Sequence, residues 1–140
     1  MSLSSRRNEV ARIAGEIASL RKRLAGEQKH LADENAKAMK AMDAMGRASS
    51  TSQLSTRARD LERHQKAAAR YAKQAADLES QIAAKDKRLA TARDSLEREE
   101  KSEQQRSDRE AAKRRRTELD HIRALERERR AAMTPPVMPV

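Results

Sequence analysis

Residues 46–52 read Gly-Arg-Ala-Ser-Ser-Thr-Ser and interrupt a hydrophobic repeat that continues on both sides of them. In each arm, apolar residues recur at alternating steps of three and four, which is the period of helices that wind around one another. Gly46 stands where a C-cap glycine ends a helix, and Thr51 or Ser52 can cap the helix that follows. The sequence therefore predicts an all-α fold, a long antiparallel helical hairpin (a coiled coil) that turns at residues 46–52.

The two arms of the repeat match when the chain is folded back about this turn. The first helix is expected over residues 4–45, and the second, whose repeat begins at Leu54, packs along it over residues 53–96. Folding at the turn places apolar on apolar, as Ile17 against Ile82, without any further choice of register. The predicted helix–helix seam consists of Val10, Ile13, Ile17, Leu20, Leu24, Leu31, Leu61, Tyr71, Leu78, Ile82, Leu89 and Leu96.

Three polar residues occupy seam positions. Glu34 is expected near His64, and Glu27 near Tyr71, whose hydroxyl can reach the carboxylate or solvent. Polar seam residues lower stability but help to set register and partner number. Glu27, Glu34 and His64 are therefore predicted to set the register of the hairpin.

A second stripe, mostly of alanine, lies one position beyond the seam in each arm. Alanine favours helix on any surface, so the stripe is open to a structural interpretation. It also allows another helix to approach closely, and a lone two-helix hairpin buries little apolar surface. Pairing of hairpins into a four-helix bundle or higher homo-oligomer would bury the stripe. Its members are Ala11, Ala14, Ala18, Ala25, Ala32, Met39, Met42, Ala58, Ala69, Ala72, Ala76, Ala83 and Ala90.

The composition argues against a globular enzyme. The 140 residues include one Tyr and no Phe, Trp or Cys, and 39% of them are charged. Phosphate-binding loops and metal-ligand spacings are absent, so we expect no catalytic residue, cofactor or metal. The chain has no stretch long and apolar enough for a membrane span, and the absence of cysteine suits the cytoplasm. Disorder is the competing interpretation of so polar a chain. A disordered chain has no reason to keep a heptad register, however, so the repeat argues against it.

Beyond the hairpin, the seam fades into a charged segment. Residues 97–133 are predicted to form a helical extension that overhangs the hairpin, and residues 134–140 a Pro-rich linker or tail. The run Lys113, Arg114, Arg115 and Arg116 is a candidate anion contact. Together with the net charge of +10, it leaves open an alternative function, weak and nonspecific binding of nucleic acid. A solvated helix face is the competing interpretation of the run.

Four stretches resemble a known module. They are the opening Met-Ser-Leu-Ser-Ser-Arg-Arg-Asn-Glu-Val-Ala-Arg-Ile, the turn region 48–56, Arg-Asp-Leu-Glu-Arg at 59–63, and residues 75–89. Together they resemble the N-terminal coiled-coil hairpin that precedes effector domains, notably Toll/interleukin-1 receptor (TIR) domains, in bacterial defence proteins. The resemblance implies a non-catalytic oligomerisation, scaffolding or sensing module that brings effector domains together. Because this chain contains no TIR domain, no catalytic residue carries over.

Overall fold

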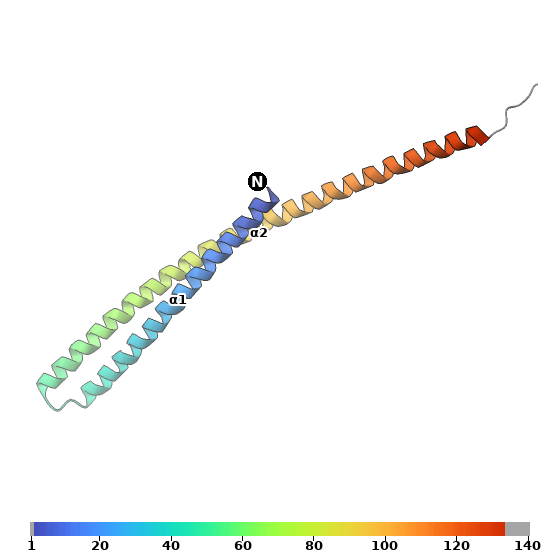
Figure 1. The fold of residues 1–140 in the computed structure, drawn as a ribbon. Helices are drawn as coiled ribbons and strands as arrows, with labels where there is room; N and C mark the ends of the chain where they lie inside the picture. Colours follow the sequence, from blue (N-terminus) through green and yellow to red (C-terminus); the bar gives the residue numbers. More distant parts are fainter. Residues whose placement is uncertain (1, 134–140) are drawn as a thin grey trace, which may run out of the picture. The chain divides into compact units, whose positions relative to one another are not determined.

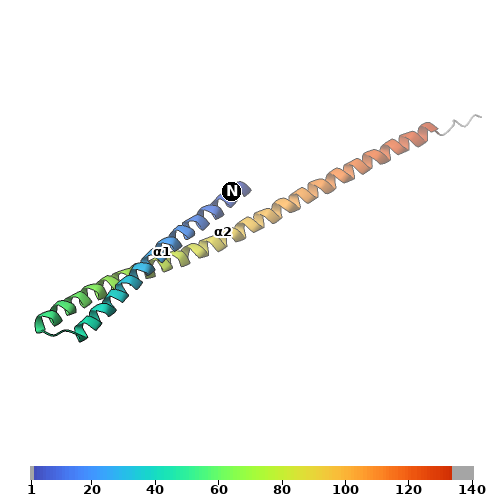
Figure 2. The same cartoon turned by 60° about the horizontal axis from the view of Figure 1, so that its bottom comes forward.

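The chain folds into two α-helices in a computed structural model that describes residues 2–133 (Figure 1). Helix α1 spans Leu3–Gly46 and helix α2 spans Thr51–Met133, and the described residues contain no strand. Both views show α1 lying antiparallel along the first part of α2 (Figures 1 and 2). The all-α helical hairpin predicted from the sequence is confirmed. The chain divides into two units, Met1–Ser95, which holds the hairpin, and Leu96–Val140.

Helix α1 is bounded by local hydrogen bonds. At its start, the Ser5 backbone N–H donates to Ser2 Oγ at 3.1 Å, so a serine side chain satisfies one of the free donors of the first turn. At its end, the expected glycine cap is wrong. Gly46 is the last helical residue, Arg47 is the C-cap with φ of −102°, and no glycine among residues 2–133 has a positive φ. The last turn of the helix closes instead with a hydrogen bond between residues three positions apart, in which the Arg47 N–H donates to the Ala44 carbonyl at 3.2 Å.

The connection between the helices is shorter than predicted, and its capping residue differs from the two expected. Helix α2 begins at Thr51. The residue before it, Ser50, accepts a hydrogen bond at its Oγ from the Gln53 backbone N–H at 3.2 Å. The Gln53 side chain accepts in return from the Ser49 backbone N–H at 3.1 Å. This reciprocal arrangement is close to a capping box. Ser50 therefore caps α2, whereas Thr51 and Ser52 lie within it.

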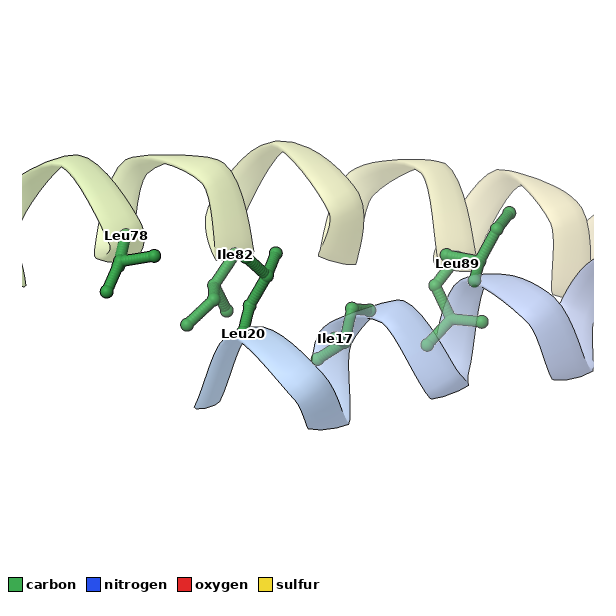
Figure 3. Packing of buried hydrophobic residues seen from close by; sticks show 6 residues of the cluster. Ile17, Leu20, Leu78, Ile82 and Leu89 are labelled. Carbon is green, nitrogen blue, oxygen red and sulfur yellow. The ribbon is translucent and has the colours of Figure 1, made fainter. Parts of the chain in front are cut away.

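The core of the hairpin is a single line of apolar side chains between α1 and α2. In Figure 3, side chains from the two helices point toward one another along this line. Leu54 departs from the predicted repeat, because 43% of its surface is exposed. It lies in the first turn of α2, just beyond the connection. The buried residues are Ile13, Ile17, Leu20, Ala41, Ala68, Ala75, Leu78, Ile82 and Leu89.

Among the described residues, the second unit consists of the part of α2 from residue 96 to residue 133. Every described residue from Lys101 onward is exposed except Ala111, which is half-buried. Its ion pairs join neighbours on the same helix, as Lys101 with Glu97 at 3.3 Å. Such pairs support a helix by a few tenths of a kcal/mol each. The predicted Pro-rich segment at residues 134–140 lies outside the described residues.

Candidate functional site: the seam and the two sides of the hairpin

The predicted seam residues are among the less exposed side chains of the two helices. Six of them form one buried cluster, in which Ile17 is 3% exposed and Ile13 is 4% exposed. The other members of the cluster are Leu20, Leu78, Ile82 and Leu89. The remaining seam residues are half-buried: Val10, Leu24, Leu31, Leu61, Tyr71 and Leu96.

A polar contact crosses the seam between Glu34 and His64. Glu34 Oε2 lies 2.7 Å from His64 Nδ1, and both side chains are largely shielded from solvent. The hydrogen bond from His64 lowers the pKa of Glu34 below its ordinary value of 4.5, and the charges of Lys37 and Arg63 lower it further. The contact joins residues from the two arms at the level at which the folded repeat places them.

The ring of Tyr71 has neighbours that the sequence prediction did not include. The ring of Tyr71 stacks on His30, with ring centroids 5.1 Å apart, and the Arg70 guanidinium lies 5.4 Å from the ring centre. Within residues 2–133, Glu27 Oε2 is buried and has no hydrogen-bond partner. The sequence prediction concerned only the Tyr71 hydroxyl, and it did not include the stacking of the ring on His30, which lies one position outside the apolar repeat.

Two further ion pairs cross between the helices, and the sequence prediction did not include them. Glu16 Oε2 meets Lys85 Nζ at 2.7 Å, and Arg21 lies 3.8 Å from Asp86. The hydrogen bond from Lys85 lowers the pKa of Glu16. Glu16 directly precedes Ile17, whose side chain points into the seam. Lys85 itself stands at a position of the repeat, three residues after Ile82 and four before Leu89. This charged seam position, and the charged residues next to seam positions in α1, were the signal that could have revealed these pairs.

The two pairs mark opposite sides of the hairpin. Glu16 and Arg21 flank the seam of α1 to either side, because Ile17 follows the first and Leu20 precedes the second. On the Glu16 side, an open groove of about 550 Å³ lies between the helices. We call this the groove side. The residues that line the groove are mostly polar or charged: Arg6, Glu9, Arg12, Ile13, Glu16, Lys87, Arg88, Thr91, Ala92 and Ser95.

The Arg21 side carries the predicted stripe of small residues. Residues three, four or seven positions apart share a helix face. Ala14, Ala18 and Ala25 therefore lie on the Arg21 side of α1, and the corresponding alanines of α2 lie on the Asp86 side. The contact between Arg21 and Asp86 shows that both stripes belong to one side of the hairpin. We call this the alanine-rich side; its exposed alanines are Ala11, Ala18, Ala25, Ala32, Ala69, Ala72, Ala76, Ala83 and Ala90, and Ala14 and Ala58 are half-buried.

The basic run lies in the second unit and is exposed throughout. Lys113, Arg114, Arg115 and Arg116 are all solvent-accessible, and Arg114 reaches Glu110 at 3.9 Å. Because four adjacent residues of a helix point in different directions around its axis, the run does not form a single stripe. A shallow open hollow of about 490 Å³ beside the run is lined by residues of α2 alone: Glu110, Lys113, Arg114, Thr117 and Glu118. Because one helix supplies all of these residues, the run offers charge on an open surface.

The described residues contain no group of three or more His, Cys, Asp or Glu side chains placed to hold a metal ion. Within residues 2–133, neither α1 nor α2 contains a stretch that is long and apolar enough to cross a membrane. Comparison with protein-family models, with curated proteins and with solved structures gave no match.

Proposed function

We propose that the chain is a non-catalytic oligomerisation and scaffolding module. The observation that carries the proposal is the thinness of the core. The hairpin has nine buried residues, and among the described residues no large side chain is completely buried. Two helices in contact along one seam leave most of their surface to solvent, which makes such a hairpin marginal in isolation. Packing against further helices would add the buried area that the seam alone lacks.

The mass of the chain in solution tests this function. Sedimentation equilibrium or light scattering of the whole chain should give a multiple of 15.8 kDa at micromolar concentration. A mass of one chain at every concentration up to the millimolar range would remove the proposal. Circular dichroism of the same samples establishes that the helices are folded when the mass is measured.

A second candidate function is nonspecific binding of nucleic acid in the cytoplasm. It is favoured by the exposed run from Lys113 to Arg116 and by the net charge of +10. Contacts of this kind weaken steeply as salt displaces them, so duplex DNA should bind at about 50 mM salt and dissociate as salt is raised. Replacing the four basic residues with glutamine should abolish that binding, whereas oligomerisation by the hairpin should be unaffected. Absence of binding at low salt excludes this candidate.

The use of the module in defence is a separate proposal. The resemblance of residues 1–130 to hairpins that precede TIR-type effector domains supports it, and the assembled module would then bring such domains together. The coding sequence that follows codon 140, or the adjacent gene, provides the test. An effector domain of this type is the expected finding, and a gene unrelated to defence would count against it.

A further inference from the structure

Two large apolar side chains of the alanine-rich side are left in water. Met39 is 69% exposed and Met42 is 57% exposed, close to the connection between the helices. They lie seven and ten positions beyond Ala32 on the same face of α1. Flexible thioethers of this kind are common at surfaces that bind another protein. The alanine-rich side thus combines bulky apolar contacts near the connection with small residues along its length.

The charges on this side are divided between the two helices. On α1, the charged residues in register with the stripe are Arg7 and Arg21. On α2 they are Glu62, Glu79 and Asp86, with Arg93 as the basic exception. Within one side of the hairpin, α1 is therefore basic and α2 is net acidic.

We propose that the alanine-rich side binds the same side of a second copy of this chain, with α1 of each copy lying over α2 of the other. This two-fold arrangement places the connections of both hairpins at the same end. It sets Arg21 over the acidic residues Glu79 and Asp86 of the second copy. The opposite arrangement, α1 over α1, sets basic on basic and acidic on acidic, which costs binding energy. The inference rests on the proposed oligomerisation and names its surface.

The size of this side is sufficient for a stable dimer. A helix of about 44 residues is about 66 Å long, and two adjacent helices are about 20 Å wide. The resulting face of more than about 1,000 Å² exceeds the roughly 800 Å² per partner that a standard interface buries. Small side chains let helices approach closely over such a length. Burial of Met39 and Met42 against Ala58 of the second copy would remove apolar surface from water at one end.

A pair of substitutions on each side of the hairpin tests the surface. Met39→Glu with Met42→Glu places two charges in the proposed interface. Gln81 lies four positions before Lys85 and Gln74 seven before Gln81, so both share the groove-side face of α2 with Lys85. Gln74→Glu with Gln81→Glu therefore adds the same charge on the groove side. The first variant should weaken association at least about tenfold by sedimentation, because charges at a dry interface lose hydration. The second should associate like the unaltered chain. All four residues are exposed, so helicity should be retained in both variants.

The outcomes separate the two proposals. If the unaltered chain is monomeric, both the oligomerisation and this surface are wrong. If the unaltered chain oligomerises and Met39→Glu with Met42→Glu leaves association unchanged, the surface is wrong while the oligomerisation stands. Loss of association in both variants to the same degree also overturns the assignment to the alanine-rich side.

Cross-linking tests the orientation without relying on the loss of binding. Since the chain contains no cysteine, one can be introduced at a time. Chains with Met39→Cys mixed with chains with Ala58→Cys should form a disulfide-linked pair under mild oxidation. A matched mixture of Met39→Cys with Gln74→Cys, which lies on the groove side, should link little. Equal linking in both mixtures would overturn the proposed arrangement.

Discussion

The hairpin in residues 2–95 and the segment 96–133 are both helical, yet they differ in what their side chains contact. All nine buried residues lie in the hairpin, whereas described residues from Lys101 onward are exposed apart from half-buried Ala111. Polar contacts between the two helices of the hairpin, such as Glu34 with His64 and Glu16 with Lys85, join residues 30 and 69 positions apart. Ion pairs of the second unit, such as Lys101 with Glu97 and Arg106 with Glu103, join neighbours four or three positions apart. Helix formation alone therefore does not distinguish the regions; burial between two helices does.

The largest expected effect is on the buried seam. Ile17→Ala removes a side chain that is 3% exposed, so it should lower the free energy of unfolding by about 2–5 kcal/mol. The matched control is Ile122→Ala in the second unit, where the side chain is 50% exposed and the change should be within about 0.5 kcal/mol. Urea denaturation followed by circular dichroism measures both. Equal effects would mean that the two regions do not differ in burial as described.

A smaller effect is expected at the connection. Ser50→Ala removes the oxygen that accepts from the Gln53 N–H and should destabilise the hairpin by about 1 kcal/mol. Ser52→Ala is the control, because Ser52 lies inside α2 and its side chain does not make this bond. Thermal unfolding of the two variants measures the difference. A larger loss of stability in Ser52→Ala than in Ser50→Ala would indicate that Ser52 caps α2, as the sequence suggested.

The smallest expected effect concerns pH. The pKa values of Glu16 and Glu34 are lowered in the folded chain by Lys85 and His64 respectively. Lowered values mean that the pairs contribute stability above pH 4.5 and lose it as the pH falls through the folded pKa. The urea midpoint should therefore fall on acidification. The double variant Glu16→Gln with Glu34→Gln should show a shallower fall, and an unchanged slope would contradict the role of these pairs.

Much of the fold follows from residue spacing. The repeat through Ile17, Leu20, Leu78 and Ile82 predicts both helices and their mutual face, because only a period near 3.5 keeps one stripe against a partner. The contact of Glu34 with His64 follows from the same register. Leu54 shows where the pattern fails. It continues the repeat but lies 43% exposed in the first turn of α2.

The local bonds at the helix ends were less predictable. Serine and threonine occupy neighbouring positions in the connection, and each can cap a helix. Which one does so depends on where the backbone leaves the helical conformation. Ser50 caps α2 together with Gln53, and α1 ends at Gly46, with Arg47 as its C-cap and no glycine in the left-handed conformation. These differences of one or two residues arise from hydrogen-bond geometry that residue type alone does not define.

The two helices and their matching apolar stripes follow from the order of the residues alone, because helix propensity and heptad spacing are local properties of the chain. The charged pairs that meet across the helices, Arg21 with Asp86 and Glu16 with Lys85, depend instead on how the two helices pack. The same packing of α1 against α2 places the polar groove side and the alanine-rich side on opposite sides of the hairpin. The physical reason is that spacing defines a face on one helix, whereas the rotation of two helices about their shared seam decides which faces form one surface.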